Sequence, residues 1–195
     1  AWSVKKSSEH VLTAVNSWLH SQTQHSQHRY DRERGYVCTF SALVLKSTTA
    51  HLFHIGDARI CRLQGQALEQ LTTDHRVFVT HDKSCLSRAL GVQQQLDLDY
   101  LALPLEVGDI FVLTTDGVHE HMDGAFVAGA IAQAGDDLAR AALDRDRGDL
   151  GREAAARTTS PSRSFVWMNC QPPKRQKSPP CPSPCCLRLC LLTAR

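Results

Sequence analysis

Two short acidic turns carry the residues of this sequence that could do metal chemistry. Asp57 follows Gly56 directly after an apolar run, and Asp116 is followed by Gly117 and, four residues on, by Glu120. Carboxylate oxygens are the ligands that hard cations such as Mg²⁺ and Mn²⁺ prefer. Aspartates held at the ends of two strands could therefore converge on one metal site. Gly-Asp and Asp-Gly are also common turn dipeptides, so a purely structural role stays open.

The elements that must position these turns can be predicted from the pattern of apolar residues. Residues Val11, Leu12, Val15, Trp18 and Leu19 recur at helical spacing, which predicts an amphipathic helix over Ser8–Ser21 and then a loop over Gln22–Arg34. β-branched, aromatic and aliphatic runs predict strands over Tyr36–Lys46, Ala50–Gly56, Arg59–Leu63 and Ile110–Thr115, with a hairpin turn at Gln64-Gly65-Gln66. Asp123 is placed to cap a helix that runs to about Ala134. Strands grouped between helices indicate an α+β domain with an antiparallel core.

Composition divides the chain near residue 150. Residues 1–150 have a net charge of −5, whereas residues 151–195 have a net charge of +7 and hold five of the eight cysteines. The sequence contains no apolar run of about eighteen residues and no secretory pattern, so we expect a cytoplasmic protein that has no membrane contact.

The basic tail, residues 151–195, admits three interpretations. Its cysteines could bind zinc, but their spacing matches no paired Cys-x-x-Cys pattern and no histidine lies among them. Its charge could attract nucleic acid, but Phe165 and Trp167 are the only aromatic residues available for stacking. We therefore expect an unstructured extension and no nucleic-acid partner.

Five ordered motifs give the chain a resemblance to a known family. They are Gly56-Asp57-Ala58-Arg59, Leu71-Thr72-Thr73-Asp74-His75, Leu86-Ser87-Arg88-Ala89-Leu90-Gly91, Gly108-Asp109-Ile110-Phe111-Val112-Leu113 and Thr115-Asp116-Gly117-Val118-His119-Glu120. Their order and spacing resemble the protein phosphatase 2C (PPM) family, and most closely its bacterial members, including the phosphatase part of proteins that also carry a C-terminal kinase domain. The resemblance implies an antiparallel β-sandwich flanked by helices, incomplete here.

The resemblance also implies a function and a set of site residues. It implies a dinuclear Mn²⁺ or Mg²⁺ site whose bound water hydrolyses phosphoserine and phosphothreonine of a phosphoprotein substrate. Asp116, with Gly117, matches the core metal site, and Asp57 and Glu120 match positions of a further, more loosely held ion. No side chain is assigned a catalytic role, because the motif of His75 is structural in the family and Ser87-Arg88 lacks a partner histidine.

Two family features are missing, so we expect impaired activity. The Asp-Gly-x-Gly-Gly turn that opens the family does not precede Ala1, which predicts a truncated N-terminus, and the closing Asp-Asn turn is replaced by the tail. Codons read one base out of register from Gly151 through Cys170 permit a Gly-Ser turn, an Asp-Asn turn and a strand, which suggests a frameshift. The alternative is a non-catalytic phosphoprotein-binding module of the same fold.

Overall fold

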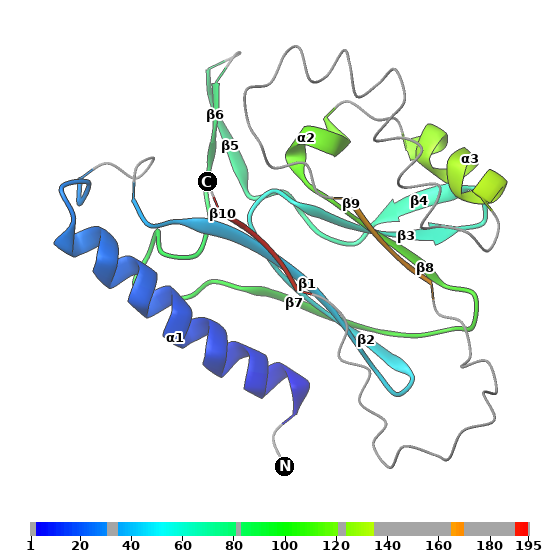
Figure 1. The fold of residues 1–195 in the computed structure, drawn as a ribbon, viewed down its shortest axis with the longest axis horizontal. Helices are drawn as coiled ribbons and strands as arrows, with labels where there is room; N and C mark the ends of the chain where they lie inside the picture. Colours follow the sequence, from blue (N-terminus) through cyan, green and yellow to red (C-terminus); the bar gives the residue numbers. More distant parts are fainter. Residues whose placement is uncertain are drawn as a thin grey trace. The chain divides into compact units, whose positions relative to one another are not determined.

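The computed structural model describes residues 3–30, 35–80, 83–120, 124–134, 165–169 and 190–194 (Figure 1). They form two compact units: unit 1 is Ala1–Asp57, Asp74–Leu105 and Lys174–Arg195, and unit 2 is Ala58–Thr73 and Glu106–Pro173. Every strand pair described is antiparallel. The α+β class with antiparallel sheets is therefore confirmed. None of the described helices is long and apolar enough to cross a membrane.

Unit 1 is built on a four-stranded sheet in the order β10-β1-β2-β7. Its strands are β1 (Cys38–Lys46), β2 (Thr49–Ile55), β7 (Asp99–Pro104) and β10 (Cys190–Ala194), and a separate hairpin joins β5 (Arg76–Thr80) to β6 (Lys83–Leu86). Helix α1 (Val4–His25) contributes Leu12 to a core with Phe40, Phe53 and Leu90. The predicted strands over β1 and β2 are confirmed.

Helix α1 corrects the sequence prediction in its length and in its buried face. The Ser3 hydroxyl caps the helix by accepting from the Lys6 N–H, and the helix continues to His25, so the loop predicted from Gln22 begins four residues too early. Leu12, Asn16 and Thr23 are its buried residues, while Val11 and Trp18 are each 59% exposed. The prediction that Val11 and Trp18 belong to the face of the helix that packs on the core is therefore wrong.

Unit 2 contains a second four-stranded sheet in the order β4-β3-β8-β9. Its strands are β3 (Arg59–Gln64), β4 (Ala67–Gln70), β8 (Ile110–Thr114) and β9 (Phe165–Asn169). Helix α3 (Gly124–Ala134) packs Val127 and Ile131 against Val112 of β8. The predicted β3–β4 hairpin, strand β8 and helix α3 are confirmed, while the proposed cap Asp123 lies outside the described residues.

Two described strands fall in the basic tail that we expected to be unstructured. Strand β9 pairs with β8, and β10 pairs with β1. Both segments are short apolar runs in sequence, which suits strand formation. The expectation does not hold for these ten residues; the rest of the tail, the boundary at residue 150 and the frameshift lie outside the described residues and stay predictions.

Candidate metal site

The Gly56-Asp57 turn links β2 to β3, and its backbone can be formed only by glycine at position 56. Gly56 has φ +124°, and a Cβ atom there would lie 2.4 Å from the Cβ of Thr39. Such a φ is accessible to glycine and strained for other residues. Both main-chain polar groups of Gly56 are taken by His75, whose N–H donates to the Gly56 carbonyl at 2.8 Å and whose Nδ1 accepts from the Gly56 N–H at 3.0 Å. The turn is therefore rigid.

The Asp57 carboxylate lies buried at this turn and already contacts a cation. Its Oδ2 accepts a hydrogen bond from Nε of Arg76 at 2.8 Å. The Asp57 side chain is 7% exposed and the Arg76 side chain 19% exposed. A charge-assisted bond of this length in a poorly hydrated place is stronger than a surface ion pair. Asp57 thus has an internal counter-ion.

His75 is a structural hub, which agrees with the role expected from its motif. Because its Nδ1 accepts from Gly56, its ring proton is on Nε2, which donates to Asp99 at 2.9 Å. The ring is buried and lies 4.8 Å, centroid to centroid, from that of His54. With both ring nitrogens engaged, His75 has no group left to exchange a proton with a substrate.

Asp99 links His75 to Arg88 through hydrogen bonds to both. The Arg88 guanidinium donates to Asp99 at 2.5 Å and also pairs with Asp97 at 3.0 Å. Burial acts to raise the pKa of Asp99, but hydrogen bonds from Arg88 and His75, together with the charge of Arg88, lower the pKa of this carboxyl overall. Arg88, which we expected to be structural rather than a phosphate clamp, is therefore held by two carboxylates.

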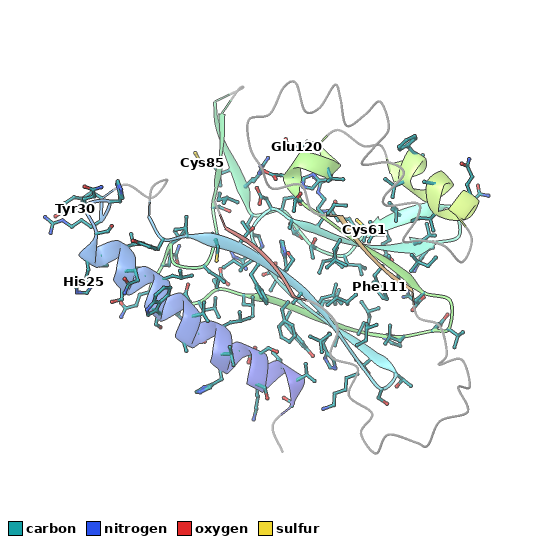
Figure 2. All side chains as sticks on the ribbon, viewed as in Figure 1. His25, Tyr30, Cys61, Cys85, Phe111 and Glu120 are labelled. Atoms are coloured by element: carbon teal, nitrogen blue, oxygen red, sulfur yellow. The ribbon has the colours of Figure 1, made fainter. Side chains whose placement is uncertain are left out.

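The second acidic turn is a short helix rather than a simple turn. Buried strand β8 ends at Thr114, and α2 (Asp116–His119) begins after Thr115. Asp116 Oδ1 accepts from the Gly117 N–H at 2.9 Å, and the Glu120 N–H donates to the Asp116 carbonyl at 3.1 Å. This helical bond places Asp116 and Glu120 four residues apart on one side of the turn, and Glu120 is exposed at its end (Figure 2).

The carboxylates are ligands of the kind that a hard divalent ion prefers, but the described residues bring together fewer of them than such an ion needs. Asp116 and Glu120 supply oxygen donors, as Mn²⁺ and Mg²⁺ require. Among the residues that the structure describes, no three side chains of His, Cys, Asp or Glu come close enough to hold a metal ion. The described part of unit 2 therefore offers a two-carboxylate donor set.

The candidate residues are distributed over both units. Asp116, Gly117 and Glu120 lie together in unit 2, and Asp57 lies in unit 1. The positions of the units relative to each other are not determined, so a meeting of Asp57 with Asp116 stays a prediction. Sequence reasoning missed Arg76 and Asp99; the only signal for Arg76 was its place next to His75 of the motif.

The remaining histidines and cysteines that we considered do not form a site in the described residues. His51 contacts the Tyr100 hydroxyl and His54 contacts the Ser41 hydroxyl, each at 2.8 Å. Cys38, Cys61 and Cys85 are thiols of intermediate burial.

Comparison with known proteins gives consistent matches. The family model described as protein phosphatase 2C matches residues 3–157. The protein phosphatase PhpP of Streptococcus pneumoniae is 25% identical over 131 residues, which are 60% of this chain and 51% of that protein. The serine/threonine phosphatase stp of Listeria monocytogenes is 27% identical over 143 residues, 60% of this chain and 55% of that protein. The chain thus spans about half the length of the curated relatives that it matches.

Solved structures show the same fold. PppA, described as a key regulatory component of T6SS in Pseudomonas aeruginosa, matches with a TM-score of 0.63 and 25% identity over 82% of this chain and 66% of that chain. The catalytic domain of the serine/threonine protein phosphatase PstP, in complex with two manganese ions, matches with a TM-score of 0.64 and 19% identity over 86% and 71% of the two chains. Since the family model covers most of the sequence, this chain belongs to the protein phosphatase 2C family.

Proposed function

We propose that this chain is part of a metal-dependent protein serine/threonine phosphatase, a hydrolase that acts on phosphoserine and phosphothreonine of a phosphoprotein. Membership of the protein phosphatase 2C family supports the reaction class, as do the names of the PhpP and stp relatives. The two manganese ions in the PstP structure support Mn²⁺ or Mg²⁺ in a dinuclear site. A cytoplasmic location is a proposal from the sequence pattern, and a C-terminal kinase domain in the intact gene product is a proposal from the family resemblance.

The observation that carries this proposal is the pair of carboxylates at α2. Asp116 starts the helix directly after the buried end of β8, and Glu120 follows one turn later. We propose that Asp116, with Gly117, holds an ion of the core metal site and that Glu120, with Asp57, belongs to a further, more loosely held ion. When bound, the metal ions would supply an activated water for attack at phosphorus. The task of the chain itself is to hold these acids in place, and buried Thr115 helps to fix the start of α2.

In sequence, Asp57 and Asp116 flank two strands that pair with each other in unit 2. Arg59 of β3 pairs with Thr114 of β8. Asp57 is two residues before Arg59, and Asp116 is two residues after Thr114. A contribution of Asp57 to a further, more loosely held ion is a proposal from the family resemblance.

We predict that the isolated chain has turnover of p-nitrophenyl phosphate with Mn²⁺ close to the rate without enzyme. Two carboxylates are fewer ligands than a dinuclear centre needs, and the described residues contain no group of three. The assay compares the chain with Asp116→Asn over a range of Mn²⁺ concentrations. Ordinary phosphatase turnover that the Asn variant abolishes would contradict the predicted impairment.

The alternative to a phosphatase is a non-catalytic module of the same fold that binds a phosphoprotein. Calorimetry with a phosphothreonine peptide separates the two functions. A phosphatase site requires Mn²⁺ for peptide binding, and the Asp116→Asn variant should lose that binding. Binding in EDTA without any phosphate release would favour the module.

A further inference from the structure

The ion pair between Asp57 and Arg76 lies at one of the acids proposed to bind metal. Arg76 is the first residue of β5, directly after His75, so two consecutive residues engage the turn. His75 binds both main-chain polar groups of Gly56, and Arg76 binds the Asp57 carboxylate. The main chain directly before β5 is held in turn, because the Ser87 N–H donates to the His75 carbonyl at 2.9 Å. The hydrogen bonds of His75 therefore hold Arg76 in place beside Asp57.

A buried carboxylate needs a positive partner, and here the partner is part of the chain. An uncompensated charge at a side chain that is 7% exposed would be costly, and the guanidinium offsets that cost through a 2.8 Å bond. A divalent ion that takes the same oxygen must displace this bond and move a second positive charge next to Arg76. The two cations thus compete for one carboxylate.

We propose that Arg76 is a positioning residue that serves as the internal counter-cation of Asp57 and competes with a divalent metal ion for it. The competition rests on the proposed function, in which Asp57 holds the more loosely bound ion. Arg76 fixes the carboxylate when metal is absent and weakens metal binding at that position. The charge of residue 76 is then a determinant of metal occupancy in this chain.

The ion pair between Arg62 and Asp109 in unit 2 is a matched control for the pair between Arg76 and Asp57. Arg62 donates through Nε and an Nη nitrogen to Asp109 at 2.7–3.0 Å, with side-chain exposures of 15% and 9%. Asp109 also accepts from the Glu106 N–H, as expected of a carboxylate that closes a turn. Removal of this pair costs stability in a similar way but takes no cation from a proposed metal ligand.

The experiment measures Mn²⁺ binding to the full chain by electron paramagnetic resonance of free Mn²⁺. It compares wild type, Arg76→Gln, Arg76→Lys, the double variant Asp57→Asn/Arg76→Gln, and the control Arg62→Gln. We expect Arg76→Gln to tighten the weaker Mn²⁺ binding at least about fivefold. Arg76→Lys keeps the charge and should bind Mn²⁺ as wild type does, the double variant should lose the gain, and Arg62→Gln should leave binding unchanged.

A metal-free measurement tests the counter-cation role by itself. In EDTA, Asp57→Asn and Arg76→Gln should each lower Tm, and the double variant should lower it by clearly less than the sum, since the two residues act as a pair. Additive losses would overturn the counter-cation role.

The binding outcomes separate this inference from the proposed function. Mn²⁺ binding that Asp116→Asn abolishes but Arg76→Gln leaves unchanged or weaker would overturn the competition alone. Failure of every variant to bind Mn²⁺, Arg76→Gln included, would overturn both the competition and the proposed metal site.

Discussion

At the scale of single residues, the polar groups around the Gly56-Asp57 turn form a connected network inside unit 1. It runs from Arg88 to Asp99, on to His75, and from His75 to the main chain of Gly56. Each group accepts or donates in the direction that its chemistry allows. The network explains why the polar ring of His75 can be buried inside unit 1.

Asp99 should account for part of the loss of folding stability at acid pH. Its pKa is lowered in the folded chain, because the hydrogen bonds from Arg88 and His75 and the charge of Arg88 outweigh the opposing effect of burial. A lowered folded-state pKa means that its stabilising contribution is present above the unfolded pKa and is lost as pH falls through the folded value. The urea midpoints of wild type and Asp99→Asn should therefore differ at pH 7 and converge toward pH 3. The exposed Glu9→Gln serves as control, and a gap that stays constant would contradict this.

At the scale of elements, the two turns that flank β3 differ in how strictly they need glycine. Gly56 has φ +124° and would place a Cβ against Thr39, whereas Gly65 has φ +62° with nothing within 4 Å of a Cβ. We predict that Gly65→Ala costs about 1 kcal/mol of unfolding free energy, the cost of left-handed backbone, and that Gly56→Ala costs at least about 3 kcal/mol. Urea unfolding measures both, and equal losses would contradict the rigid turn.

Helix α1 shows what periodicity can and cannot predict. The pattern gave a helix correctly, but it counted apolar residues and so passed over Asn16, which is 1% exposed. The Asn16 side chain donates to the carbonyls of Gln93 and Gln94 and accepts from the Gly91 N–H at 2.8 Å. Partners 75 residues or more away in sequence decide which face is buried, and no local pattern contains them.

Replacement of Asn16 by alanine should destabilise the chain by about 2–3 kcal/mol, because three hydrogen bonds are lost and the Gly91 N–H remains buried. The matched control is Ser17→Ala on the exposed side of the same helix, which should change the unfolding free energy by less than about 0.5 kcal/mol. Chemical denaturation monitored by tryptophan fluorescence measures both. A loss for Asn16→Ala as small as that of the control would show that Leu12 and its neighbours orient α1 without it.

Strands β5, β6 and β7 were not predicted, because the alternation of residues along them is weak or interrupted. Strand β7 alternates weakly and contains Asp99 and Tyr100, whose partners His75 and His51 lie far away in sequence. The β5–β6 hairpin has a register shift between Phe78 and Thr80, so its period is broken. For the site, sequence and resemblance gave Asp57, Asp116 and Glu120, whereas Arg76 could be identified only from its contact with Asp57.

At the scale of the whole molecule, each unit carries one part of the proposed metal chemistry. Unit 2 supplies Asp116, Gly117 and Glu120 through β8 and α2, and unit 1 supplies Asp57 with its counter-ion Arg76. The chain crosses from unit 1 to unit 2 directly after Asp57. A change in that turn is therefore expected to affect both metal binding and stability.

Binding of Mn²⁺ through α2 is the most direct test of the proposed function. We predict that the wild-type chain binds Mn²⁺ in an electron paramagnetic resonance titration and that Asp116→Asn weakens this binding at least about tenfold, as expected when a charged ligand is lost. Asp109→Asn, which removes a carboxylate engaged by Arg62 instead, should leave it unchanged. Equal Mn²⁺ affinity of wild type and Asp116→Asn would contradict the assignment of this acid as a metal ligand.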